Sequence, residues 1–241
     1  MPTAAVLVAA GSGERLGADR PKAFVVVGGR PMLEWSLSAL RTAGIAPVVV
    51  VVPPHGGAVT RGAGRADPGD PVRGVVAAFG EAGGAGIRSV PGGETRSESV
   101  RNGLAALPSD VGRVVVHDAA RPLVGPGLFA RCLAELDQGA DAAIAAARVT
   151  DTVKEAGADR RVVATLDRSR LWAIQTPQAF RREILERALA QPDDVIRAAT
   201  DDAMLVEALG GRVVVVQSSP ANFKVTTPHD LEVAGLLLAR R

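Results

Sequence analysis

The chain of 241 residues contains no tyrosine and a single cysteine. One cysteine, Cys132, excludes an internal disulfide and any cysteine cluster for zinc or iron–sulfur, so we expect a protein of the reducing cytoplasm. No apolar stretch is long enough to cross a membrane, and the short apolar run near the N-terminus lacks the positive leader of a signal peptide. We therefore expect no membrane partner.

The chain also has little net charge and few histidines. The formal net charge is only +2, which implies no bulk affinity for nucleic acid. Of the three histidines, we expect His117 to be structural, and His55 and His229 to lie in loops. None has an obvious acid–base partner nearby in sequence, so histidine catalysis and a histidine metal site are not expected.

Aromatic residues make up 3% of the chain and apolar residues 47%, so the core must be built from Ala, Val, Leu and Ile. Valine-rich runs at 48–52, 114–116 and 213–216 predict strands that are buried on both faces, as in a parallel sheet. Strands and helices alternate as in a wound α/β fold, and nothing divides the chain, so one domain is expected over 1–241. Residues 55–71, rich in Gly, Pro, Arg and Asp, predict a surface loop.

A predicted strand runs straight into a glycine loop in AAVLVAAGSGERLGADRPK, residues 4–22. Gly11 and Gly13 allow backbone N–H groups to approach an anion, and Arg15 and Lys22 add the charge that a triphosphate needs. No hydroxyl follows the lysine as in a Walker A loop, and the third glycine of the dinucleotide fingerprint is absent at its spacing. The pattern is typical of nucleotidyltransferases that activate sugars and polyols.

Two later strand ends also carry polar residues, and strand ends are where ligands bind in such sheets. In Gly92-Gly93-x-x-Arg96-x-x-Ser99 the sequence offers flexible backbone, a cation and a hydroxyl, although a helix cap would explain this run equally well. Asp118 and Arg121 follow the strand at 114–116. They could form a buried ion pair, or Asp118 could bind ribose hydroxyls or a magnesium ion.

Residues 148–172 interrupt the alternation with two strand-like halves joined by a polar turn, which predicts a β-hairpin arm. A protruding hairpin can hardly bury its apolar positions alone. We therefore expect the arm to pack on a second subunit and the protein to be a homodimer.

Four segments, AAGSGERLGADRPK, GGETRSESV, VVVHDAARP and NFKVTTPHDL, follow one another with DTVK, LDRSRLW and TDDA between them. In order and spacing the chain resembles the 2-C-methyl-D-erythritol 4-phosphate cytidylyltransferase family from residue 4 to about 238. The resemblance implies a Rossmann-like, mostly parallel α/β sheet of the nucleotide-diphospho-sugar transferase type. It also implies cytidylyl transfer from CTP to methylerythritol 4-phosphate with Mg²⁺, in the non-mevalonate isoprenoid pathway.

The same resemblance implies a role for particular residues. The cations around the triphosphate are Arg15, Lys22 and Lys224. The nucleotide-binding residues are Ala9, Ala10, Gly11, Gly13, Gly92, Glu94, Ser99, Asp118 and Ala119. The residues for methylerythritol phosphate are Arg121, Thr152, Arg168 and Thr200, together with Lys224, and in the family Thr152 and Arg168 reach the partner subunit's substrate. The metal ligands stay open, with Asp118 as the candidate.

Three alternatives are kept. Ribitol 5-phosphate cytidylyltransferases share the loop, the HDAxRP segment and the last lysine, but Ala9-Ala10-Gly11, Ala120 and Asp167-Arg168 favour methylerythritol phosphate. A sugar-phosphate nucleotidylyltransferase that uses another nucleoside triphosphate is more distant. A non-catalytic nucleotide-binding regulator is disfavoured because the loop cations, Asp118 and Lys224 are all retained.

Overall fold

The computed structural model describes residues 1–17, 21–54 and 86–240, so the surface loop predicted at 55–71 lies outside the described residues. The central sheet has the strand order β11-β7-β10-β6-β1-β4-β5. Its strands are β1 (Thr3–Val8), β4 (Val48–Val52), β5 (Ile87–Pro91), β6 (Arg113–Asp118), β7 (Ala142–Arg148), β10 (Trp172–Arg181) and β11 (Val213–Gln217). Only β10 runs antiparallel to its neighbours within this sheet, which confirms a mostly parallel α/β fold.

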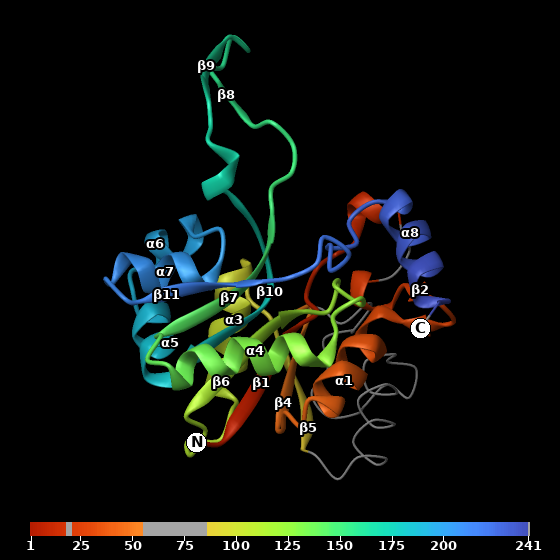
Figure 1. Cartoon of the computed structure of the whole chain (residues 1–241). Helices are drawn as coiled ribbons and strands as arrows, with labels where there is room; N and C mark the ends of the chain where they lie inside the picture. Colours follow the sequence, from red (N-terminus) through yellow and green to blue (C-terminus); the bar gives the residue numbers. More distant parts are fainter. Residues whose placement is uncertain (18–20, 55–85, 241) are drawn as a thin grey trace.

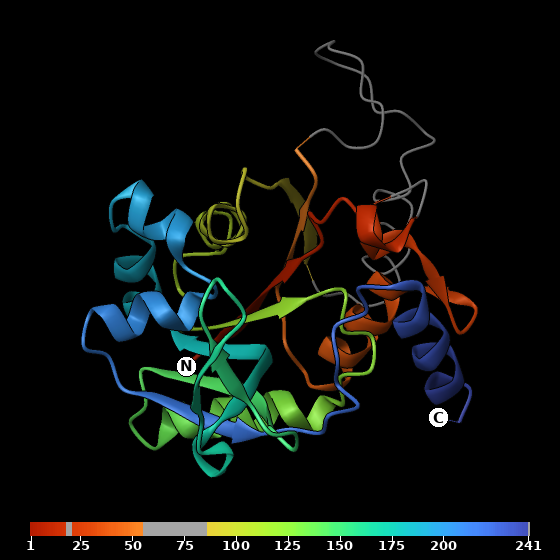
Figure 2. The same ribbon diagram turned by 90° about the horizontal axis from the view of Figure 1, so that it is seen from above.

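Helices cover both faces of this sheet (Figure 2). One face packs on α1 (Met32–Thr42) and α4 (Pro126–Asp137), and the other on α3 (Arg96–Ala105), α5 (Arg182–Leu189), α6 (Asp193–Ala198) and α7 (Asp202–Ala208). Along β1, Ala5 and Leu7 join the first apolar cluster while Ala4 and Val6 join the second. This alternation explains why the strands are apolar throughout, because each side chain meets a helix layer.

A smaller apolar cluster lies beside the glycine loop. It joins α8 (Pro228–Leu238) to β2 (Val26–Val27), which pairs with β3 (Arg30–Pro31), and to the short helix η1 (Glu14–Leu16) and the start of α1. Leu16, Val27 and Val225 are buried in it. Figure 1 shows α8 and β2 side by side at one end of the molecule. The segment before α8 is thereby held close to the loop at the start of the chain.

Two sequence predictions are wrong in detail. The run at 213–216 is not buried on both faces, because β11 pairs only with β7 at the sheet edge and Val215 stays 40% exposed. The runs at 48–52 and 114–116 are buried as predicted, apart from the half-buried Val52. His229 is not a loop residue, because α8 begins at Pro228 and includes it.

A β-hairpin formed by β8 (Lys154–Ala156) and β9 (Val162–Thr165) stands away from the sheet at the end of β7 and β10 (Figure 1). At its base Arg148 pairs with Trp172 across the two strands, and the guanidinium lies 4.4 Å from the centre of the indole ring. Val162 and Val163 are 60% and 70% exposed on the hairpin. The arm is confirmed, whereas its contact with a second subunit stays a prediction.

Within the described part of the chain, the helices are all too short or too polar to traverse a lipid bilayer.

Candidate active site

A pocket of about 570 Å³ opens at the carboxyl ends of the parallel strands β1 and β6, where ligands bind in sheets of this type. Its walls are the glycine loop, the start of α3, the end of β6 and the segment before α8. The predicted site residues that line it are Ala9, Ala10, Gly11, Gly13, Arg15, Lys22, Glu94, Ser99, Asp118, Ala119 and Lys224. Residues far apart in the sequence therefore meet as predicted.

The loop after β1 turns by means of Gly13, which has a φ of 85°, in the left-handed region that favours glycine. Gly11 does not adopt a positive φ, and a side chain there would meet open space. The N–H of Lys22 donates to the carbonyl of Gly11 at 3.2 Å. This hydrogen bond brings Lys22, at the end of the loop, back beside Gly11 at its start.

Gly92 lies where two walls of the pocket touch. A Cβ on Gly92 would come within 2.8 Å of Ser99 Oγ and 2.9 Å of Ala10 Cβ, closer than real side chains approach. Ser99 Oγ in turn accepts from the N–H of Gly93 at 3.1 Å and donates to the carbonyl of Thr95 at 2.9 Å. Gly92 is not among the lining residues, but it lets Ser99 and Ala10 approach each other.

A helix cap was the alternative explanation for the run from Gly92 to Ser99. The structure contains such a cap, but at Thr95 and Glu98. The Thr95 hydroxyl accepts from the N–H of Glu98 at 3.2 Å, and the Glu98 carboxylate accepts from the N–H of Thr95 at 3.0 Å. This reciprocal pair begins α3 and satisfies its first donors. Ser99 and Glu94 take no part in the pair and line the pocket.

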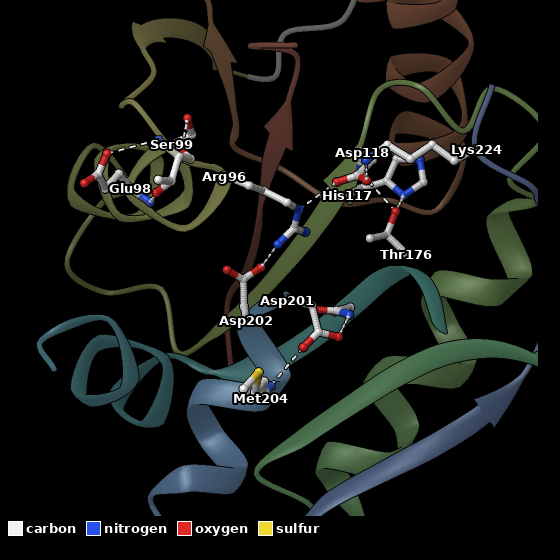
Figure 3. Close-up of polar contacts among 12 residues, drawn as sticks. Arg96, Glu98, Ser99, His117, Asp118, Thr176, Asp201, Asp202, Met204 and Lys224 are labelled. Atoms are coloured by element: carbon white, nitrogen blue, oxygen red, sulfur yellow. Dashed lines mark hydrogen bonds and ion pairs between the residues drawn. The ribbon is translucent and has the colours of Figure 1, made fainter. Parts of the chain in front are cut away.

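Asp118 lies between two cations, as Figure 3 shows. Its Oδ1 is 3.2 Å from Arg96 Nε and its Oδ2 is 2.8 Å from Lys224 Nζ. Burial alone would raise the pKa of Asp118, but Arg96, Lys224 and Arg121 outweigh it and lower the pKa below its usual range. The carboxylate is therefore ionised at neutral pH.

Arg121 does not form the buried ion pair with Asp118 that the sequence allowed. Its Nη1 donates to the carbonyl of Asn222 at 2.9 Å, and its Nη2 to that of Ile174 at 3.4 Å. The guanidinium is buried and lies outside the set of residues that line the pocket. In this structure Arg121 therefore anchors the segment that leads to Lys224.

His117 is structural, as expected. It is fully buried, and its Nδ1 lies 3.0 Å from the hydroxyl of Thr176, which accepts from the N–H of Asp118 at 3.0 Å. Burial lowers the pKa of His117 to about 3, so the ring is neutral at physiological pH. The Thr176 hydroxyl thereby fixes the backbone that carries Asp118 into the pocket.

Lys22 belongs to a cluster of cations. Burial, followed by the charges of Lys224 and Arg15, lowers the pKa of Lys22 to about 8, although Asp118 and Asp230 act in the opposite direction. Bringing like charges together at a half-buried site costs free energy, and a bound anion removes this cost. The glycine loop with this cluster therefore has the chemistry of a phosphate site.

The described residues offer no dedicated metal site. No group of three or more His, Cys, Asp or Glu side chains comes together in them, and both oxygens of Asp118 are already paired with cations. Mg²⁺ commonly binds through one carboxylate or two together with substrate phosphates and water. Besides Asp118, the carboxylates of Glu14 and Glu94 line the pocket, so a metal ion that arrives with the nucleotide would find carboxylate oxygens there.

Besides Gly92 and Arg121, three predicted residues lie outside the pocket lining. Thr152 and Arg168 are exposed on the arm, where an Nη1 hydrogen of Arg168 is donated to the carbonyl of Thr150. Thr200 is exposed just before α7. Arg96, noted in the sequence as the cation of the run from Gly92 to Ser99, was not among the predicted site residues, but it lines the pocket and pairs with Asp118. Its place after two glycines at a strand end was the available signal.

A glycine loop after the first strand, a cation cluster and a buried acid at the carboxyl edge of this sheet define a nucleotidyltransferase. The comparison with protein families agrees. The family model of 2-C-methyl-D-erythritol 4-phosphate cytidylyltransferase (IspD) matches residues 3–240. The chain belongs to this family.

Curated relatives that bear the same name are similar over nearly the whole chain. One from Synechococcus sp. (strain WH7803) is 42% identical over 237 residues, which cover 98% of this chain and 99% of the relative. One from Streptomyces coelicolor is 44% identical over 246 residues, which cover 99% of this chain and 86% of the relative.

Solved structures agree in fold. The 4-diphosphocytidyl-2C-methyl-D-erythritol synthase from Anaerococcus prevotii superposes with a TM-score of 0.81 at 30% identity, covering 99% of both chains. The 2-C-methyl-D-erythritol 4-phosphate cytidylyltransferase from Thermus thermophilus superposes with a TM-score of 0.74 at 35% identity, covering 99% of this chain and 100% of the other.

Proposed function

We propose that the pocket binds CTP and 2-C-methyl-D-erythritol 4-phosphate and joins them to 4-diphosphocytidyl-2-C-methyl-D-erythritol and pyrophosphate, a step of non-mevalonate isoprenoid synthesis. Membership of the family supports this reaction. A phosphate oxygen of the acceptor attacks the α-phosphorus of CTP and forms a new P–O bond. The bond from the α-phosphorus to the bridging oxygen breaks, and its electron pair leaves with pyrophosphate.

The observation that carries the proposal is the cation cluster of Arg15, Lys22 and Lys224 around the glycine loop. Both reactants are anions, so their approach is opposed by repulsion that these cations reduce. The same charges stabilise the additional negative charge of the pentacoordinate transition state and the leaving pyrophosphate. Catalysis then depends on placement and charge, and no protein nucleophile is needed.

We assign the nucleoside to the wall between the loop and α3. The backbone of Ala9, Ala10 and Gly92 and the hydroxyl of Ser99 meet there, which supports a cytosine site. Backbone acceptors facing the N4 amine would distinguish cytosine from uracil, and Glu94 would contribute through its backbone. Asp118 and Ala119, at the end of β6, would meet the ribose.

Magnesium belongs to the proposal as an ion that binds with CTP. It would supply charge neutralisation on the phosphates. On the protein side, Asp118 would be the candidate ligand among the carboxylates that line the pocket.

The second substrate site is proposed to need a second copy of the chain. Thr152 and Arg168 lie on the exposed arm, outside the set of residues that line the pocket of their own chain. The exposed Val162 and Val163 give the arm an apolar surface to bury. We therefore assign Thr152 and Arg168 to the partner's pocket, and Arg121, Thr200 and Lys224 to the chain's own.

The remaining parts of the proposal concern the whole chain. We propose that residues 1–241 work as one nucleotidyltransferase domain with the arm at about 148–172. A cytoplasmic location is supported by the single cysteine, whose burial raises the pKa of the Cys132 thiol to about 12 and leaves it unreactive.

The test is pyrophosphate release from CTP with Mg²⁺ and either methylerythritol 4-phosphate or ribitol 5-phosphate, with each component omitted in turn. Release with methylerythritol 4-phosphate alone is expected. Preference for ribitol 5-phosphate would keep the mechanism and change the acceptor. A preference for another nucleoside triphosphate, or CTP binding without pyrophosphate release, would reject the proposed reaction.

A further inference from the structure

Arg96 joins two carboxylates that belong to different elements. Its Nε is 3.2 Å from Oδ1 of Asp118 at the end of β6, and its Nη1 is 2.6 Å from Oδ2 of Asp202 at the start of α7. Figure 3 shows the guanidinium between the two acids. Asp118 lines the pocket, whereas Asp202 is not among the lining residues. Arg96 is thus the side chain that connects Asp202 to the pocket.

Asp202 is not needed as the cap of its helix. The neighbouring Asp201 already caps α7, because one of its oxygens accepts from the N–H of Met204 at 2.9 Å. Asp202 is 0% exposed, and its Oδ1 has no hydrogen-bond partner among the described residues. Burying an ionised carboxylate in this way is unfavourable unless a cation pairs with it. Arg96 is that cation.

The pair with Asp202 restricts how Arg96 can bind Asp118. A guanidinium prefers to bind a carboxylate with two parallel N–H groups. Here Asp202 holds Nη1 and thereby fixes the orientation of the guanidinium, in which Nη2 has no partner among the described residues and Asp118 receives only Nε. The second oxygen of Asp118 pairs with Lys224 Nζ at 2.8 Å. Without the charge on Asp202, the guanidinium is free to rotate until Nε and Nη2 both face Asp118, and it then competes with Lys224 for Oδ2.

We propose that Asp202 is a positioning residue for nucleotidyl transfer: by engaging one side of the Arg96 guanidinium, it leaves one oxygen of Asp118 to hold Lys224 at the pocket. Asp202 acts without touching substrate, and its charge is what matters. The inference rests on the proposed function, because the phosphate role of Lys224 belongs to that proposal.

The variant Asp202→Asn keeps the shape of the side chain and removes the charge, and Asp201→Asn is its matched control one residue earlier. We expect Asp202→Asn to lower kcat by about tenfold or more, because Lys224 no longer stabilises the transition state from its place at the pocket. Asp201→Asn should keep kcat within about twofold, because asparagine also caps helices. Asp202→Glu should recover much of the loss.

A double-mutant cycle tests the route through Arg96. If Asp202 acts through Arg96, then adding Asp202→Asn to Arg96→Met lowers kcat no further than Arg96→Met alone. If the two residues act independently, the two losses multiply. Multiplying losses would overturn the inference.

Crystal structures of the two asparagine variants give a readout that does not depend on turnover. The contact of 2.8 Å between Lys224 and Asp118 should be lost in Asp202→Asn and retained in Asp201→Asn. Retention in both variants would overturn the positioning role whatever the kinetics show. A wild-type chain that releases no pyrophosphate would instead reject the proposed function, so the two failures are distinguishable.

Discussion

At the scale of single residues, Lys22 is held beside the glycine loop by its backbone, and its surroundings disfavour the charged form of its ammonium group. We expect Lys22→Ala to lower kcat by about two orders of magnitude or more without unfolding the protein, because one preorganised charge at the transition state is lost. The measurement is steady-state pyrophosphate release, with circular dichroism to confirm the fold. Arg187→Ala, which removes an exposed cation from α5, serves as the control. A near-normal kcat for Lys22→Ala would remove Lys22 from the mechanism.

The lowered pKa of Lys22 also predicts how CTP binding depends on pH. In the enzyme without CTP the pKa of Lys22 is about 8, and the phosphates of bound CTP will raise it. Binding therefore takes up protons above about pH 8, and CTP affinity falls as the pH rises through that value. Titration calorimetry in two buffers of different protonation enthalpy measures the uptake. Lys22→Arg should abolish it, and equal uptake in both proteins would assign the protons to another group.

Gly92 is predicted to control nucleotide affinity by its lack of a side chain. In Gly92→Ala the new Cβ would lie 2.8 Å from Ser99 Oγ and 2.9 Å from Ala10 Cβ, so the loop and the start of α3 must move apart. We expect KM for CTP to rise about tenfold or more, with a smaller change in KM for methylerythritol phosphate. Gly125→Ala is a suitable control, because a Cβ there meets no atom within 4 Å. An unchanged KM for CTP would place the cytosine elsewhere.

Neutral His117 predicts a pH-dependent stability. Its pKa is lowered by burial from 6.5 to about 3, so the unfolded chain takes up a proton that the folded chain refuses. The stability it provides is complete above pH 6.5 and is lost as the pH falls toward 3, at up to about 1.4 kcal/mol per pH unit. Urea unfolding at about pH 6 and about pH 4.5 measures the slope. His117→Gln should reduce it, and an equal slope would mean that His117 is charged in the fold.

At the scale of elements, the sequence predicts best what is decided locally. Val48–Val52 is a strand with those bounds, because five successive valines with both faces buried leave little alternative. α8 starts at Pro228 after the cap Thr227, and both residue types are locally favoured at these positions. The glycine loop was likewise predicted from adjacent residues.

What the sequence could not predict depends on contacts between distant segments. The insertion of β10 between β6 and β7 is set by the return of the arm, which no local pattern records. The exposure of Val215 follows from the place of β11 at the sheet edge. The ion pair of Arg96 with Asp202 joins residues 106 positions apart, and neither residue type indicates the other as its partner.

At the scale of the whole molecule, the proposed dimer makes each active site a joint product of two chains. Lys22→Ala damages the pocket of the chain that carries it, and Arg168→Ala damages only the arm that this chain extends to its partner's pocket. A mixed dimer therefore keeps one intact pocket served by one intact arm. After unfolding and refolding an equal mixture of the two inactive variants, we expect about a quarter of wild-type activity, because half of the dimers are mixed and each has one site.

The control for this complementation is each variant refolded alone, which should stay inactive. Sedimentation velocity at micromolar concentration should show a dimer in every sample. A mixture that regains no activity would mean that Arg168 serves the pocket of its own chain, and a monomer would reject the dimer itself.

The arm leaves the sheet from β7 and returns into its neighbour β10, with Arg148 directly opposite Trp172 at the point of exit. Its two ends are therefore already side by side and held in register by the sheet. In the proposed dimer, a hairpin from a relative, spliced in between these two positions with Thr152 and Arg168 kept, would change which chains recognise each other and leave the nucleotide pocket intact. Partner choice and nucleotide chemistry could in this way evolve separately within one chain.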